Sequence, residues 1–184
     1  MRLRWGVPAL AAATLVAALA TQAAIPREKV DVEAAKRALA ARSLQFPVKG
    51  QEAALRDNFH ERRGNVPHEA LDIMAPRGTP VVAVDDGTIA KLFTSKPGGL
   101  TIYQYDPAGK LAYYYAHLDR YAPGIKQGDR VKRGQVVGYV GSTGNARADA
   151  PHLHFTVYAL PPGKQWWRGV AINPYEKLAT PLAQ

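Results

Sequence analysis

The sequence predicts an all-β domain of antiparallel strands over residues 46–178, and three observations lead to that prediction. Short runs of β-branched, aromatic and aliphatic residues are separated by Gly, Pro and Asp. Residues 113–117, Tyr-Tyr-Tyr-Ala-His, have the alternation of a strand with two unlike faces. No long helical pattern lies between the runs, so the strands should pair antiparallel in a sandwich or an open barrel.

The strands are expected wherever an apolar run is bounded by turn residues. Asp86-Gly87 and the segment 106–109, Asp-Pro-Ala-Gly, are typical of turns between strands. Residues 179–184 remain as a C-terminal tail. The expected strands are Val81–Val84, Gly87–Phe93, Leu100–Tyr105, Leu111–Ala116, Gln135–Val140 and His152–Tyr158.

A short helix is expected ahead of the domain, in a linker over residues 25–45. Asp31 is placed to cap this helix, and Val32, Ala35 and Leu39 fall on one stripe of it. Pro and Gly residues then break the helical pattern.

The first 24 residues predict export. Arg2 and Arg4 precede an uncharged stretch at residues 7–20 made mostly of Ala, Leu and Val, and small residues follow it. This order is typical of a secretory signal peptide over residues 1–24. The alternative is a signal anchor, because residues 5–25 carry no charge and about 20 residues span a bilayer. In both cases we expect the rest of the chain in the periplasm or at the outer face of the cytoplasmic membrane.

The charge of the chain favours an anionic environment. The net charge is +9, and removing residues 1–24 takes away two arginines and no acids, which leaves +7. A basic exported protein is attracted to anionic envelope surfaces. The basic residues are scattered and form no dense run, which argues against nucleic acid as a partner. No cysteine is present, so neither a disulfide nor a lipid-modified cysteine is expected, and the oligomeric state is left open.

Two pairs of polar residues have the chemistry of metal ligands. His68 and Asp72 are four residues apart, an even spacing that would place both on one face of a strand. His152 and His154 are two apart, which puts two imidazoles about 6.6 to 6.8 Å apart on one face. A catalytic zinc takes three such ligands and a water. With His117, the chain offers more donors than one zinc can use.

The sequence around these pairs resembles the lysostaphin-type (LytM-domain) zinc metallopeptidases, a family of peptidoglycan endopeptidases. Ala70 departs from the family pattern, which usually has Gly between the His and the Asp; this removes backbone freedom but no ligand. The matching segments cover the domain in the family's order: HEALDIMAPRGTPV (68–81), DG (86–87), YAHL (115–118), GDRVKRGQ (128–135), GYVGSTG (138–144) and PHLHF (151–155).

The resemblance implies an antiparallel β fold with a groove that holds one zinc ion per chain. His68, Asp72 and His154 match the family's metal ligands, and His117 and His152 match its two non-ligand catalytic histidines. The implied reaction is hydrolysis of amide bonds in peptidoglycan peptides by zinc-activated water. Imidazoles suit the proton transfers because their pKa lies near neutral pH.

Two other classes of protein share parts of this pattern. Some LytM-domain proteins have lost zinc ligands and activate separate wall amidases, but all five matching polar positions are present here. The segment 128–135 resembles a hairpin of biotinyl and lipoyl carrier domains, yet the Met-Lys or Asp-Lys pair that would carry the cofactor does not follow it. An enzyme is therefore the favoured interpretation.

Aromatic residues near the histidines are candidates for the substrate groove. Tyr113 and Tyr115 share a face with His117 by simple alternation, so they are the groove candidates. Trp166 and Trp167 are interpreted as core or edge residues. The Gly-rich turn with Ser142, Thr143 and Asn145 is expected to flank the groove, and His60, beside two arginines, is interpreted as a structural residue.

The sequence leaves the cleaved amide bond open. A Gly-Gly bridge, a D-Ala–diaminopimelate cross-link and a non-wall peptide all fit the same chemistry. Because no separate wall-binding module is evident, the D-Ala cross-link of a Gram-negative envelope is the expected substrate.

Overall fold

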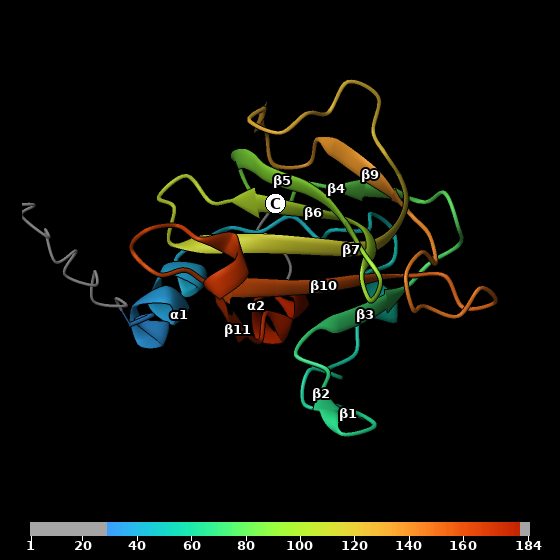
Figure 1. Cartoon of the computed structure of the whole chain (residues 1–184), viewed down its shortest axis with the longest axis horizontal. Coiled ribbons are helices and arrows are strands. Elements are labelled where there is room, and N and C mark those ends of the chain that lie inside the picture. The colour runs from blue at the N-terminus through green and yellow to red at the C-terminus, as the bar shows by residue number, and fades with distance from the viewer. Residues whose placement is uncertain (1–28, 181–184) are drawn as a thin grey trace, which may run out of the picture.

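A computed structural model describes residues 29–180, so the expected export segment 1–24 lies outside the described residues (Figure 1). The described chain begins with helix α1 (Val32–Ala40), which confirms the expected N-terminal helix. The Asp31 side chain caps it by accepting a hydrogen bond from the Ala34 amide at 2.8 Å. Ala35 and Leu39 are buried and join the core of the sheet domain. Within residues 29–180, no helix has the length and apolarity needed to cross a membrane.

A nine-stranded antiparallel sheet forms the rest of the domain within the described residues and confirms the predicted fold class. A separate two-stranded hairpin, β1 (Arg62–Arg63) and β2 (Val66–Pro67), projects from it beside β3 (Figure 1). Short helices η1 (Glu52–Ala54), η2 (Trp166–Arg168) and α2 (Tyr175–Ala179) complete the elements. The sheet strands are β3 (Leu71–Met74), β4 (Pro80–Val82), β5 (Gly87–Ser95), β6 (Gly99–Tyr105), β7 (Leu111–Tyr121), β8 (Arg130–Val131), β9 (Val136–Val140), β10 (His152–Ala159) and β11 (Val170–Ile172).

Strands β7 and β10 are central to this sheet. The main strand order is β11-β10-β7-β6-β5-β8. Strand β3 pairs with the first half of β10, on residues 152–155, and β11 pairs with its last residues, 157–159. The far end of β7 leaves β10 and pairs with β9, which pairs in turn with β4. Asp72 on β3 and His154 on β10 therefore lie opposite each other on two hydrogen-bonded strands.

A β-bulge in β7 changes which side chains face the groove. Opposite the β6 segment from Leu100 to Ile102, β7 places the longer segment from Leu118 to Tyr115, so β7 carries one extra residue there. Within this bulge His117 has a positive φ of 59°. The extra residue reverses the alternation, so His117 lies on the side of Tyr114 and not of Tyr115. The prediction that Tyr113 and Tyr115 line the groove is therefore wrong: both are fully buried in the core.

A network of buried polar groups lies against the core face of β7. The Tyr113 hydroxyl donates to Asp85 at 2.9 Å, and the Tyr115 hydroxyl donates to Gln104 at 2.8 Å. Arg42, which follows α1, reaches both Asp85 at 3.6 Å and Asp106 at 2.5 Å. The segment after the helix is thus attached to the sheet by ion pairs as well as by apolar packing.

Candidate metal centre

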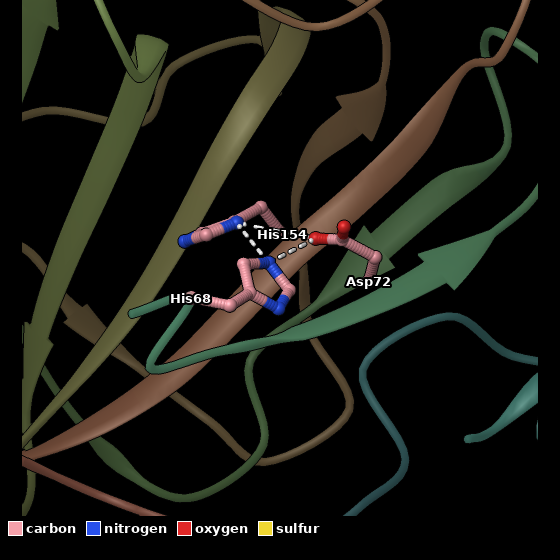
Figure 2. Close-up of side chains that lie close together, drawn as sticks. All are labelled: His68, Asp72 and His154. Atoms are coloured by element: carbon pink, nitrogen blue, oxygen red, sulfur yellow. Dashed lines mark hydrogen bonds and ion pairs between the residues drawn. The ribbon is translucent and has the colours of Figure 1, made fainter. Parts of the chain in front are cut away.

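Three side chains from two distant parts of the chain converge on one point (Figure 2). His68 Nε2 lies 3.0 Å from Asp72 Oδ1 and 3.2 Å from His154 Nδ1. His154 Nδ1 lies 3.2 Å from the same Asp72 oxygen. The structure therefore brings together the three residues that the sequence analysis identified as metal ligands.

The spacing of these three atoms fits a tetrahedral zinc ion. Zinc bonds to imidazole nitrogen and carboxylate oxygen are about 2.0–2.2 Å long, so two ligands of one tetrahedral zinc lie roughly 3.3–3.6 Å apart. The observed triangle has sides of 3.0, 3.2 and 3.2 Å. Two neutral nitrogens and one carboxylate oxygen also match the donor chemistry of catalytic zinc sites, which leave the fourth position open.

The local backbone brings these ligands together in two ways. Asp72 on β3 is the direct cross-strand partner of His154 on β10, so their side chains leave the sheet on the same face. His68 is not on a strand, contrary to the prediction from its spacing; it lies in the connection between β2 and β3. Glu69, the next residue, has a positive φ of 54° and redirects the chain, which lets His68 approach Asp72. Ala70 has no such φ and is fully buried, so its departure from the family pattern does not disturb the turn.

His117 and His152 lie beside the three ligand candidates. The His117 ring is 4.9 Å from the His152 ring and 5.4 Å from the His154 ring, between centroids. His152 Nε2 is 3.6 Å from Asp72 Oδ1. All five predicted site residues are therefore in one cluster. His60 is exposed and packs against the edge of Phe59 outside it.

Backbone carbonyls orient three of the four imidazoles. Nδ1 of His68 lies 2.9 Å from the Asn58 carbonyl, that of His117 lies 2.8 Å from the Thr143 carbonyl, and that of His152 lies 2.9 Å from the Ala150 carbonyl. A carbonyl only accepts, so each neutral ring carries its hydrogen on Nδ1 and presents the Nε2 lone pair to the site. Such second contacts fix the tautomer and orientation of metal-binding and catalytic histidines.

The electrostatics of the cluster keep the carboxylate charged and favour the neutral form of two imidazoles, those of His117 and His154. Burial would raise the pKa of Asp72, but hydrogen bonds from His154 and His68 outweigh it and hold that pKa well below its usual value. Burial lowers the pKa of His154, and it lowers the pKa of His117 to about 4. Burial also lowers the pKa of His68, but hydrogen bonds with Asp72 and Asn58 outweigh burial and raise that pKa overall.

The cluster lies in an open groove of about 700 Å³. The hairpin β1–β2 forms one wall with Arg63, and the loop before β10 forms another with Asn145, as expected for the Gly-rich turn. Tyr114 and Tyr158 line the groove, and the Tyr114 ring meets His154 edge-on at 6.1 Å. Tyr114 therefore takes the place that simple alternation gave to its neighbours.

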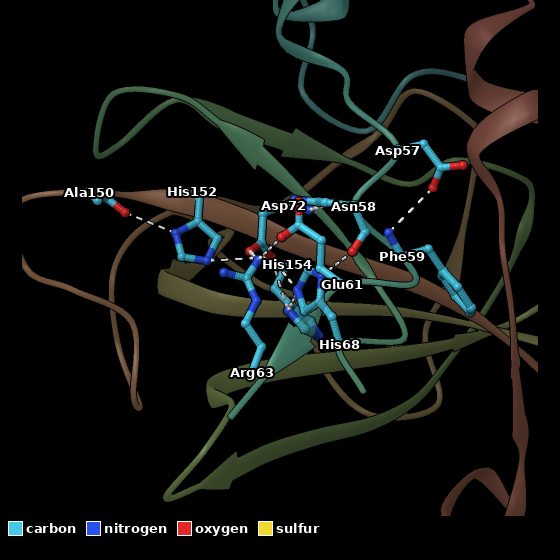
Figure 3. Close-up of polar contacts among 10 residues, drawn as sticks. All are labelled: Asp57, Asn58, Phe59, Glu61, Arg63, His68, Asp72, Ala150, His152 and His154. Carbon is cyan, nitrogen blue, oxygen red and sulfur yellow. Dashed lines mark hydrogen bonds and ion pairs between the residues drawn. The ribbon is translucent and has the colours of Figure 1, made fainter. Parts of the chain in front are cut away.

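Two residues around Asp72 were missed by the sequence analysis (Figure 3). The Arg63 guanidinium donates to Asp72 Oδ2 at 2.8 Å, and the Asn58 side-chain oxygen accepts from the Asp72 amide at 3.2 Å. Neither residue lies in a motif with a metal-ligand spacing. The only signal was that Arg63 and Asn58 precede His68 by five and ten positions.

Comparison with known proteins places these residues in a family context. A family model described as Peptidase family M23 matches residues 66–174, a range that includes all five clustered residues. Glycyl-glycine endopeptidase ALE-1 of Staphylococcus capitis is 42% identical over 89 residues, which are 48% of this chain and 24% of that protein. Peptidoglycan DD-endopeptidase ShyC of Vibrio cholerae is 36% identical over 104 residues, which are 53% of this chain and 23% of that protein. The matched region thus spans about a quarter of these curated relatives.

Solved structures show the same fold. The catalytic domain of lysostaphin from Staphylococcus simulans superposes with a TM-score of 0.61 at 28% identity, covering 74% of this chain and all of that one. A zinc-containing peptidase from Vibrio cholerae superposes with a TM-score of 0.58 at 27% identity, covering 77% of this chain and 41% of that one.

Proposed function

The chain belongs to peptidase family M23, and on that premise we propose that it is an exported zinc-dependent endopeptidase of peptidoglycan. The observation that carries the proposal is the convergence of one carboxylate oxygen and two imidazole nitrogens within 3.2 Å of one another. Two further imidazoles, those of His117 and His152, lie beside them, each with Nδ1 on a backbone carbonyl. A degenerate regulatory relative would lack part of this set.

We assign His68, Asp72 and His154 to one zinc ion per chain. When bound, zinc would polarise the scissile carbonyl and activate a water molecule for attack on it. The carboxylate of Asp72 is ionised over the whole working pH range, because its pKa is held so low. Burial keeps His154 in the neutral form that a metal ligand requires.

His117 and His152 are assigned to proton transfer. His117 is neutral at pH 7, because burial lowers its pKa to about 4, and its free Nε2 can accept a proton from the attacking water. The Ala150 carbonyl orients His152 in the same way through Nδ1. Nε2 of His152 is close enough to Asp72 to act on the same reaction centre. As the imidazolium, with a hydrogen on Nε2 as well as on Nδ1, it would stabilise the developing oxyanion or give the Nε2 proton to the leaving amine. The reaction needs no covalent enzyme intermediate.

The proposed substrate is a peptide cross-link of peptidoglycan, cleaved in a D,D-endopeptidase reaction. The named activities of the relatives include both a glycyl-glycine and a DD-endopeptidase, so family membership alone leaves the bond open. The predicted signal segment at residues 1–24 supports action in the periplasm or at the membrane surface.

Digestion of purified sacculi, with fragments identified by mass, tests the reaction and the bond together. We expect cross-linked dimers to be converted to monomers, chelation to abolish this conversion and added zinc to restore it. Undiminished hydrolysis by protein shown to be free of zinc would refute the metallopeptidase assignment. Cleavage confined to glycine bridges would refute only the choice of bond.

A further inference from the structure

The hairpin β1–β2 carries a charged contact to the metal centre that the proposed reaction does not use. Arg63 Nη2 lies 2.8 Å from Asp72 Oδ2 and 3.4 Å from Glu61 (Figure 3). Building on the proposed zinc site, we propose that Arg63 is a positioning residue. It holds the outer oxygen of Asp72 away from the metal, so that this ligand supplies one oxygen and a coordination position stays open.

The two oxygens of Asp72 have different partners. Oδ1 faces the two ligand imidazoles at 3.0 and 3.2 Å, which makes it the ligand atom. Oδ2 accepts the hydrogen bond from Arg63 instead. A carboxylate can bind a metal through one oxygen or two. Two-oxygen binding here would require Oδ2 to turn towards the metal, which would distort its charge-assisted hydrogen bond with Arg63. Such a bond is stronger than a neutral one.

Backbone hydrogen bonds hold the segment that carries Arg63 against the chain around the proposed ligand His68. The amide of His68 donates to the Glu61 carbonyl at 2.8 Å, and the amide of Glu69 donates to the Phe59 carbonyl at 2.9 Å. These bonds close the base of the hairpin next to the ligand His68. The same short segment also supplies the Asn58 carbonyl that orients His68. One segment therefore orients two of the three ligands.

A simple repulsion model makes the opposite prediction. If the guanidinium acted only as a positive charge near the site, removing it would strengthen the binding of a cation. If Arg63 instead orients Asp72, removing it should weaken zinc binding and let the second oxygen approach the metal. Loss of a second contact of this kind typically costs about 10–100-fold in metal affinity.

Arg62 offers a matched control on the same hairpin. It is exposed, and its guanidinium donates to the Asn65 carbonyl of the turn and not to Asp72. Arg62→Ala therefore removes the same charge from the same hairpin without touching the ligand. Arg63→Lys keeps the charge but loses the planar fork of donors.

The experiment measures zinc affinity by competition with a chelator, and the visible spectrum of cobalt-substituted protein, on the exported chain. We expect Arg63→Ala to bind zinc about 10–100-fold more weakly. Its cobalt absorption should also be weaker, because a second oxygen raises the coordination number. Arg63→Lys should recover part of both signals, and Arg62→Ala should match the unmodified chain.

Unchanged or tighter zinc binding by Arg63→Ala, with an unmodified cobalt spectrum, would overturn the proposal. The thermal unfolding of each metal-free variant shows whether it is folded, and Arg63→Lys provides the test if Arg63→Ala is not. Failure of the unmodified chain to bind zinc would instead count against the zinc site itself.

Discussion

Strand β7 separates two clusters of polar side chains that differ in how completely their hydrogen bonds are satisfied. On its core face, Tyr113 and Tyr115 enter the network that ends at Arg42. On its groove face, Tyr114 and the bulged His117 lie beside the proposed zinc ligands. Residues adjacent in sequence thus serve different purposes.

The core network is closed. Asp106, whose side chain is fully buried, accepts from the amides of residues 108, 110 and 111 as well as from Arg42. The Tyr115 hydroxyl accepts from the Val84 amide and donates to Gln104. Groups paired in this way stabilise the fold and have no capacity left for chemistry.

The groove cluster is open. In three of its imidazoles Nδ1 donates to a backbone carbonyl, and Nε2 is left to bind another partner. Three donor atoms crowd to within 3.2 Å of one another, a geometry that a cation would satisfy. The contrast between the closed and the open cluster separates structural from functional polar residues.

The largest expected effect is the difference in zinc content and turnover between substitutions of His152 and of His154. His154→Ala removes a proposed ligand, so we expect it to lose both zinc and detectable hydrolysis. His152→Ala and His117→Ala should retain about one zinc per chain and lose turnover by about 10²-fold or more, the scale of general acid–base catalysis. Elemental analysis and turnover on folded variants measure both quantities.

The His60→Ala variant is the control, because His60 is exposed and lies outside the cluster. It should keep zinc and turnover. An empty site in His152→Ala together with a filled one in His154→Ala would reverse the assigned roles.

The next largest effect concerns the closed cluster and should appear in stability alone. Arg42→Met leaves Asp85 and Asp106 without their cation. Breaking a buried pair costs about 3–5 kcal/mol, and the partial exposure of Arg42 reduces this to roughly 2–4 kcal/mol. Urea unfolding of metal-free protein measures the free energy of unfolding.

Lys36→Met is the matched control, because Lys36 pairs with Glu33 at the exposed surface of α1. It should change the free energy of unfolding by about 0.5 kcal/mol or less. Both variants should bind zinc normally. Loss of zinc from a folded Arg42→Met would show that the two clusters are coupled through β7.

The sequence predicted the antiparallel fold because its turn residues and alternating runs are local signals. The six expected strands all occur, within a few residues at most ends, although β7 extends to Tyr121. The site residues followed from motif spacing and family resemblance. The reason given for His68 was wrong, because Glu69 adopts a positive φ where an L-residue is uncommon. That turn depends on tertiary contacts that no local pattern records.

The bulge at His117 was also hidden from the sequence. A one-residue insertion reverses the face of every later side chain, and Tyr-Tyr-Tyr-Ala-His reads the same with or without it. The contact from Arg63 was missed for a related reason. Strands of two residues, such as β1 and β2, are too short to leave an alternation pattern.

A smaller effect tests the reversed alternation directly. Tyr115→Phe leaves the Gln104 oxygen and the Val84 amide without their buried partner and should lower the free energy of unfolding by about 1–3 kcal/mol. Tyr114→Phe removes the hydroxyl of a groove residue that is only 9% exposed, and should cost less, about 0.5–1.5 kcal/mol, the net contribution of a typical hydrogen bond. Its effect should appear in KM or turnover. Loss of activity in a stable Tyr115→Phe would place that residue in the groove after all.

The smallest effect compares two glycine substitutions in adjacent residues before β3. Glu69 is exposed and holds a φ of 54°, which costs a non-glycine residue about 1–2 kcal/mol. Glu69→Gly relieves this cost but gains about 0.5–1 kcal/mol of unfolded-state entropy, so its stability should equal or slightly exceed that of the unmodified chain.

Ala70 has an ordinary φ and a fully buried methyl group. Ala70→Gly therefore loses burial worth about 0.8 kcal/mol as well as backbone entropy. We expect Glu69→Gly to be more stable than Ala70→Gly by about 1 kcal/mol or more in urea unfolding, with normal zinc content in both. The reverse order would mean that the family's glycine position, and not Glu69, carries the strain of the turn.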